Sequence, residues 1–281
     1  MIVTSHEEVQ KYLPSYALKV KVDRIKDFLD RAQQWVSDCI IGPDIEAILE
    51  IDIAEGAPDP HERLRTFTSR AICELAYITM VAEMDLQLSE AGFVVQNNDN
   101  MSPASQQRTE KLVQSLHSRL CSDCDNLVKL LLTDSAYDDW KITDQFNYLT
   151  NNFMPTTIVA RMYAPSSMQM TKWQEFYELQ PKMSESLRGP VANYVSNDQI
   201  EALLLLYRME GLNENQKKVL RWIRMATLGH VTGSPNADHF AIEARQWMLK
   251  HESDFPEFVA SDRYELPKPF DAGDGTVANF L

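Results

Sequence analysis

The chain has 281 residues, of which 44% are hydrophobic and 24% are charged, a composition typical of a soluble globular protein with one large domain or two modest ones. Lys and Arg total 27 against 41 Asp and Glu, so the net charge is −14, and we exclude nucleic-acid binding through the general surface, which needs a basic balance. The acidity has two interpretations: a charge that keeps the protein soluble, or a surface that DNA passes without binding.

Membrane and secretion signals are missing from the sequence. No run of 18 apolar residues occurs, and the opening "MIVTSHEEVQKYL" lacks the basic and apolar parts of a secretory signal. We therefore expect no membrane association. Four cysteines fall in segments with helical apolar periodicity, where free thiols act as small hydrophobic side chains, so structural disulfides are not expected. These are Cys39, Cys73, Cys121 and Cys124.

Helical periodicity dominates the first third of the chain. Apolar residues at i, i+3, i+4 and i+7 predict a helix over residues 22–41, which Gly42 and Pro43 end, and a short helix follows in "DIEAILEI". After a loop with two prolines, a long helix is predicted over 62–88. Very few polar side chains occur in its residues 71–82, so we expect it to be the central buried helix.

A polar excursion, "GFVVQNNDNM", interrupts the helical pattern at residues 92–101. Residues 93–95 predict a short strand, and the Asn and Asp residues at 97–100 predict a turn because they tolerate the left-handed conformation. We expect a small β-hairpin or extended arm. Ser102 as N-cap and Pro103 at the first helical position then predict a helix that runs to about residue 132.

The second half begins with a weak pattern. Aromatic residues and prolines accumulate over residues 138–167, which indicates a connection between two halves, with a short strand at 156–160. Further on, "QIEALL" at 199–204 is similar to "DIEAIL" at 44–49, and the helices before them align at an offset of 155. A degenerate repeat and chance similarity between two amphipathic units are both open interpretations.

Capping signals support a helical second half. N-cap or capping-box spacing marks three helix starts, at Ser196 with Gln199, at Asn213 with Gln216, and at Ser234 with Pro235. The tail "LPKPFDAGDGTVANFL" has no helical period, so we expect it to be extended and held in place by an assembly.

The fold class expected from these patterns is mostly α, a helical bundle that could contain two related helical units, with a small β-hairpin or arm. The predicted domains are an N-terminal helical unit over 1–137 with the arm at 92–101, a connection over 138–167, a C-terminal helical unit over 168–265 and an extended tail over 266–281.

Catalytic and cofactor motifs are not found in the sequence. There is no phosphate-binding GxxxxGK[ST] or GxGxxG, no GxSxG and no HExxH. Cys121 and Cys124 with His117 could supply three zinc ligands on one helix, but a tetrahedral site needs a fourth, so packing roles are favoured. We interpret the other candidates as capping or surface residues and expect no enzyme, no metal and no cofactor. These candidates are Asp138, Asp139, His230 and His239.

Two stretches carry a resemblance to known families. "AQQWVSDCIIGPDIEAIL" at 32–49 is similar to the opening helix, glycine and second helix of phage head-tail connector proteins. Residues 74–112 resemble a family of uncharacterised phage and prophage proteins of Bacteroides-type hosts, in which an alanine-rich helix leads to a Gly-Phe-Val arm and a Pro-Ala-Ser helix start. The resemblance covers about residues 20–150, and the C-terminal end departs from the family pattern. The matching positions are Gly92, Phe93, Pro103, Ala104 and Ser105.

The resemblance implies a helical connector-type adaptor in the neck of a virion, made in the cytoplasm of a bacterial host. Such proteins form a ring below the portal, twelve copies by resemblance, which extends the DNA channel and joins the capsid to the tail. Its partners would be further copies of itself, the portal protein and the next neck or tail protein, and DNA would pass through without sequence-specific binding.

The competing interpretation is a cytoplasmic helical protein that acts in protein–protein interaction or regulation. For the connector, we expect the arm and the tail to carry the interface, with no membrane partner. The predicted interface residues are Gly92, Phe93, Val95, Asn97, Asn98, Asn100, Phe270 and Phe280.

Overall fold

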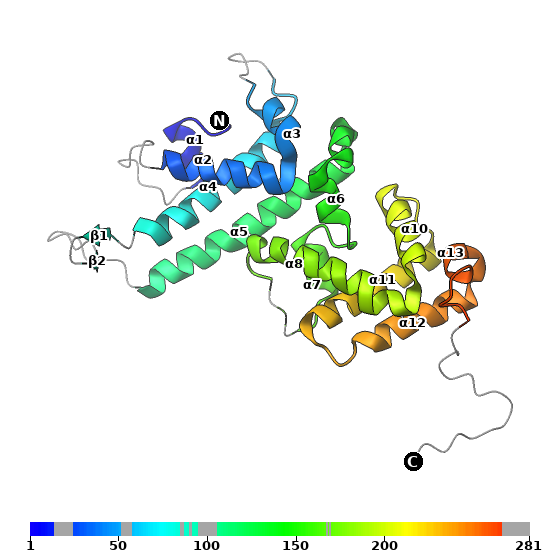
Figure 1. The fold of residues 1–281 in the computed structure, drawn as a ribbon. Helices are drawn as coiled ribbons and strands as arrows, with labels where there is room; N and C mark the ends of the chain where they lie inside the picture. Colours follow the sequence, from blue (N-terminus) through cyan, green and yellow to red (C-terminus); the bar gives the residue numbers. More distant parts are fainter. Residues whose placement is uncertain are drawn as a thin grey trace. The chain divides into compact units, whose positions relative to one another are not determined.

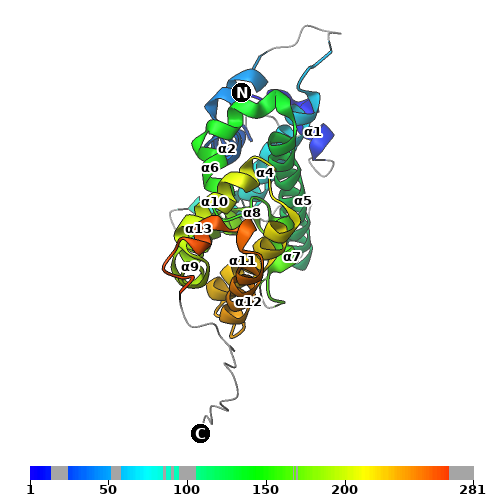
Figure 2. The same ribbon diagram turned by 90° about the vertical axis from the view of Figure 1, so that its right-hand side faces the viewer.

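The computed structural model describes residues 1–13, 25–51, 58–84, 87–89, 92–94, 106–166, 168 and 170–265. The described chain is almost entirely helical, which confirms the predicted mostly α fold (Figures 1 and 2). It divides into two compact units, which are unit 1 (Met1–Leu149 and Met170–Tyr177) and unit 2 (Thr150–Gln169 and Glu178–Leu281). The predicted domain boundaries stay predictions.

Unit 1 is built around a long helical pair, α4 and α5, which pack side by side (Figure 1). The residues of α4 from 71 to 76 are all buried, because other helices pack on more than one side of it. This confirms the prediction of a central buried helix. The elements of unit 1 are α1 His6–Tyr12, α2 Lys26–Val36, the π-helical turn η2 Ser37–Ile41, α3 Gly42–Leu49, α4 Glu62–Met84, α5 Gln106–Thr133, the 3-10 helix η3 Ser135–Ile142, most of α6 Asp144–Thr150 and the start of α8 Trp173–Ser186.

The π-helical turn η2 is held by side chains from later in the chain. Widening a helix by one residue leaves backbone carbonyls without their usual intrahelical partners. The indole Nε1 of Trp140 donates to the carbonyl of Ile40 at 2.8 Å, and Nε2 of Gln145 donates to the carbonyl of Asp38 at 3.2 Å. Gly42, with φ +78°, then redirects the chain into α3.

Unit 2 has its own apolar core between α10, α11 and α12, with Ile200, Val219, Ile223 and Met248 fully buried. The turn between α11 and α12 uses Gly233 in the left-handed conformation, and the N–H of Ser234 donates to the carbonyl of Gly229 at 2.8 Å, as in a Schellman motif. The elements are α7 Thr157–Tyr163, the end of α8, the π-helical turn η4 Leu187–Val191, α9 Ala192–Val195, α10 Asn197–Arg208, α11 Glu214–Thr232, α12 Ala237–Lys250, the 3-10 helix η5 Glu252–Asp254 and α13 Pro256–Val259.

The element order is similar in the two units. Each has a helix that ends in a π-helical turn, then short helical segments, then two long helices packed together. Aligned at the predicted offset of 155, however, η4 coincides with residues 32–36 rather than with η2. Whether the units arose by duplication stays a prediction.

Four sequence-based expectations need correction. The long helix α4 ends at Met84, not at 88, because residues 87–89 form strand β1 (Gln87–Ser89). The strand expected at 156–160 is wrong: the Thr156 hydroxyl accepts from the N–H of Val159 and caps helix α7. The capping box of Asn213 is confirmed, but Gln199 does not complete one with Ser196, since its Oε1 accepts from the N–H of Phe258.

The fourth expectation that needs correction is the arm at residues 92–101. The structure describes only its first three residues, strand β2 (Gly92–Val94), which pairs antiparallel with β1, with Leu88 opposite Phe93. The partner strand therefore precedes residue 92, so the hairpin expected around a turn at 97–100 is not confirmed. Residues 95–105, with the helix start predicted at Ser102, lie outside the described residues.

We predict that Gly229→Ala lowers the free energy of unfolding by about 1 kcal/mol. A Cβ at this position would lie 2.9 Å from the Cβ of Ala237 on α12, and the resulting overpacking exceeds the gain of about 1 kcal/mol in helix propensity. Thermal and urea unfolding followed by circular dichroism would measure the loss. Gly189→Ala is the matched control, because a Cβ there meets nothing within 4 Å, and it should leave the stability unchanged or raise it by up to about 1 kcal/mol. Equal effects at the two positions would contradict close α11–α12 packing.

Candidate functional site

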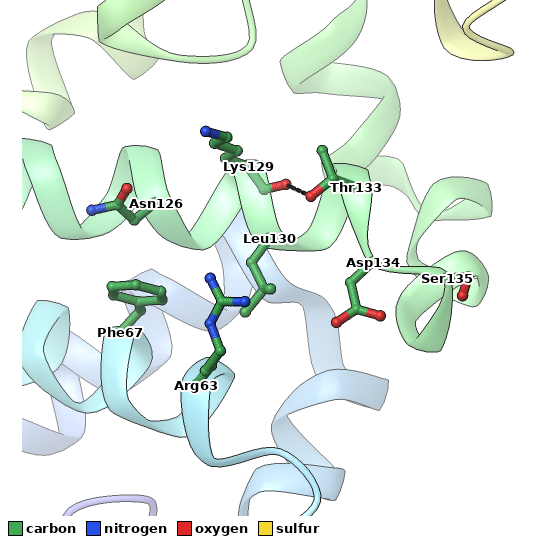
Figure 3. Close-up of a pocket in the computed structure, with 8 residues that line it drawn as sticks. All are labelled: Arg63, Phe67, Asn126, Lys129, Leu130, Thr133, Asp134 and Ser135. Carbon is green, nitrogen blue, oxygen red and sulfur yellow. Dashed lines mark hydrogen bonds between the residues drawn. The ribbon is translucent and has the colours of Figure 1, made fainter.

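A polar hollow of about 360 Å³ opens between α4, α5 and the start of η3 in unit 1 (Figure 3). In the view of Figure 3, the guanidinium of Arg63 and the carboxylate of Asp134 point into the space between the two helices, whereas the amine of Lys129 points to the other side of α5. One cation and one carboxylate can hold a small polar group. The lining residues are Arg63, Phe67, Asn126, Lys129, Leu130, Thr133, Asp134 and Ser135.

A histidine–tyrosine pair lies near this hollow. Nδ1 of His61 is 3.1 Å from the hydroxyl of Tyr137, and the N–H of His61 donates to Oδ1 of Asp59 at 2.8 Å. Burial, followed by the charges of Asp134 and Asp59, raises the pKa of Tyr137, so its hydroxyl stays protonated near neutral pH. A neutral phenol held by a histidine acts as a structural hydrogen-bonding group and does not supply a base.

Deeper in unit 1, α4 and α5 share a cluster of four charged side chains. Oε1 of Glu74, which is fully buried, lies 2.8 Å from Nε of Arg119, and Oδ1 of Asp123 lies 3.8 Å from Nη1 of Arg70. Burial raises the pKa of Glu74 to about 8, and the nearby charge of Asp123 adds to this, while the two arginines oppose it. Burial also raises the pKa of Asp123. The two carboxyl groups therefore favour holding one proton between them.

Unit 2 exposes large apolar side chains on two helices. Leu205 and Met209, at the end of α10, are 61% and 70% exposed, and Met162 on α7 is 70% exposed. Arg224 joins the ends of these helices, because its Cζ lies 5.2 Å from the ring of Tyr163 and 5.5 Å from the ring of Tyr207. Contiguous patches of exposed apolar side chains are typical of protein–protein contact surfaces, whereas single exposed apolar side chains are normal in monomers.

Most of the predicted interface residues cannot be placed. Gly92 and Phe93 lie in strand β2, where Phe93 is opposite Leu88. The other six lie outside the described residues, and the interface role of all eight stays a prediction. These six are Val95, Asn97, Asn98, Asn100, Phe270 and Phe280.

The cysteines are free thiols. Cys39, Cys73, Cys121 and Cys124 are all buried, and the Sγ of Cys121 donates to the carbonyl of Thr171 at 3.4 Å. Within the described part of the chain, no group of three or more His, Cys, Asp or Glu side chains is placed to hold a metal ion.

The two candidate histidines of unit 2 lie at the α11–α12 hairpin. Nε2 of His230 lies 3.4 Å from Oδ1 of Asp238, and His239 is exposed on α12. Sequence reasoning missed the cluster of Glu74 and the apolar side chains of unit 2. The cluster of Glu74 could have been found from the sequence, because Glu74 is the single acidic residue in the apolar run of α4.

Comparisons with known proteins give one match. Residues 21–150 match the model of a family described as Family of unknown function (DUF6712). These residues fall almost wholly in unit 1. No curated protein and no solved structure matches the chain. Among the helices that the structure describes, none combines the length and apolar character needed to cross a membrane.

We predict that unit 1 loses stability as the pH rises through about 8. The folded-state pKa of Glu74 lies above its ordinary value of 4.5, so the folded chain keeps this proton up to about pH 8 while the unfolded chain loses it near pH 4.5. The stability is therefore highest below pH 4.5, where both states are protonated, and is lost as the pH rises toward 8. Between about pH 5 and 8, the free energy of unfolding should fall by roughly 1 kcal/mol per pH unit relative to Glu74→Gln, which keeps a neutral side chain there.

Urea unfolding of the wild type and the variant across this range would measure the difference. Glu83→Gln is the control on the same helix: Glu83 is half exposed and pairs with Arg31 at 3.0 Å, so its pH profile should follow that of the wild type. Parallel profiles for the wild type and Glu74→Gln would contradict the assignment of a buried proton to Glu74.

Proposed function

We propose that the protein is a structural virion protein, a head-tail connector or neck adaptor that forms a ring below the portal. In this role it extends the DNA channel and joins the capsid to the tail. It is not an enzyme and needs no cofactor. Its partners are further copies of itself, the portal protein and the next neck or tail protein.

The observation that carries the proposal is the exposure of Leu205, Met209 and Met162 on unit 2. A ring subunit needs a rigid body that presents apolar surface to a neighbour, since burial of such side chains drives association. The two helices that carry them are fixed to one core, because Arg224 contacts Tyr163 and Tyr207 and donates from Nε to the carbonyl of Phe153 at 3.0 Å.

The net charge of −14 supports the same role. A channel wall that DNA slides past must not neutralise phosphates, and an acidic surface repels them. Residues 32–49 and 74–112 resemble phage connector and neck-gene proteins. This resemblance indicates that the assembly is the neck of a virion. The remaining candidate is a cytoplasmic helical interaction protein, which would use the same apolar side chains for another partner.

We predict that the protein forms a high-order complex with its portal, of twelve copies by resemblance, visible by native mass spectrometry and as rings in negative-stain images. Leu205→Asp and Met162→Asp should each weaken that complex, because a buried carboxylate opposes association. Helical circular dichroism and the melting temperature should change little, since both side chains are exposed.

Asn236→Asp is the matched control, because it adds the same carboxylate at an exposed polar position of unit 2, and it should assemble like the wild type. A protein that stays monomeric with portal and neck proteins under all conditions would remove the connector proposal. Stable capture of a non-virion partner through Leu205 would favour the interaction-protein alternative.

A further prediction concerns the arm at residues 92–101. Replacing residues 96–101 by a short Gly-Ser linker should leave the melting temperature nearly unchanged, because a short hairpin contributes little to the stability of an isolated chain. Ring formation or attachment of the next neck component should weaken, as measured by the same native mass spectrometry. Wild-type assembly, or a large fall in melting temperature, would show that the arm is not an assembly element.

A further inference from the structure

A second hollow, of about 340 Å³, lies in unit 1 where α1 meets the α4–α5 pair. Three of its lining residues are cations, each from a different helix: Lys11 on α1, Arg70 on α4 and Arg119 on α5. Such convergence is unusual for a protein with 41 acidic and 27 basic residues. The other lining residues are Tyr12, Ser122 and Asp123.

Tyr12 contacts all three cations, two through its aromatic ring and one through its backbone carbonyl. Nζ of Lys11 lies 5.2 Å from the ring centroid, and Cζ of Arg70 lies 6.0 Å from it. Nη2 of Arg119 donates to the carbonyl of Tyr12 at 2.8 Å. The cationic groups are thereby held near one another at the rim, where cation–π contacts offset part of their repulsion.

The hollow has fewer carboxylates than cations, and the carboxylate that lines it is not in close contact with a cation. Asp123 lines the hollow but lies 3.8 Å from Arg70, at the long end of an ion pair. Glu74 is fully buried behind Arg119 and is not part of the lining. Because burial keeps a proton on the Glu74 and Asp123 pair, three cations face one negative charge near neutral pH.

The two arginines keep donor capacity for a ligand. The side chains of Arg70 and Arg119 are both 44% exposed, and each guanidinium carries five N–H donors, of which the protein contacts use only some. Planar guanidinium groups bind carboxylate and phosphate oxygens with two parallel hydrogen bonds. The hydroxyl of Ser122, exposed at the same rim, is a further donor.

We propose that the hollow formed by Lys11, Tyr12, Arg70, Arg119, Ser122 and Asp123 is a binding site for an oxyanion, that is, a phosphate, sulfate or carboxylate group. Arg70 and Lys11 contact the anion, and Arg119, fixed by Glu74 and the Tyr12 carbonyl, positions the wall of the site. The proposal goes beyond the connector role and does not depend on it, since the site lies within one subunit.

The direct test is titration of the full chain with inorganic sulfate, sodium acetate and a hexaglutamate peptide at constant ionic strength, followed by calorimetry and amide chemical shifts. We expect saturable binding of at least one of these probes, with shifts confined to α1, α4 and α5. Sulfate binding without acetate or peptide binding would identify a phosphate-like ligand. Peptide binding would identify a carboxylate on a partner chain.

Arg70→Gln and Lys11→Gln should each weaken binding roughly tenfold, because each removes a charge-assisted contact. Arg31→Gln is the matched control: it removes an exposed arginine and its ion pair with Glu83 from the same unit but touches no residue of the hollow, so affinity should be unchanged. Circular dichroism melts would show that the variants are folded. No saturable binding of any probe, or equal losses in Arg31→Gln, would overturn the site.

The pH dependence gives an independent readout. Glu74 is faced by Asp123 and Arg119 from α5 and by Arg70 on its own helix. Loss of its proton as the pH rises through about 8 adds a negative charge behind the hollow, so sulfate affinity should fall several-fold between pH 7 and 9. Glu74→Gln should abolish this fall, and a pH profile that is the same in the variant would overturn the role of Glu74.

Discussion

Burial of the middle of α4, residues 71–76, is the constraint on which unit 1 depends. Residues 71–76 are all buried, so Glu74, the one acidic residue among them, is buried as well. A buried carboxylate without a partner is costly, and here the cost is reduced by Arg119 at 2.8 Å and by the raised pKa that keeps a proton on the pair with Asp123. The arrangement of charges around the hollow at α1 follows from this one burial.

The helices could be predicted from the sequence because each buries an apolar stripe against a neighbour. The period of 3.6 residues predicts α2, α3, α4 and the end of α5 to within a few residues. The π-helical turns could not be predicted, because a one-residue widening leaves the apolar period nearly unchanged. What stabilises η2 is the indole of Trp140, a residue 100 positions away from the carbonyl that it binds.

The strand predicted at 156–160 shows a different kind of failure. Thr156 caps a helix with its hydroxyl, and residues 157–163 form that helix. In a segment this short, local capping and tertiary packing outweigh β propensity. The exposure of Met162 on this helix was not predicted either, because the sequence indicated a connection there and not a helix.

The candidate sites were hidden from sequence analysis for a related reason. The hollow at α1 joins Lys11, Arg70 and Arg119, which are separated by 59 and 49 residues and have no common motif. Only the packing of three helices brings these cations together. In the sequence, each one is indistinguishable from an ordinary surface cation. Charge convergence of this kind is a property of the tertiary structure. Sequence separation therefore hides the three cations of unit 1, whereas the exposure of Leu205 and Met209 in unit 2 depends on which face of α10 packs against its own core.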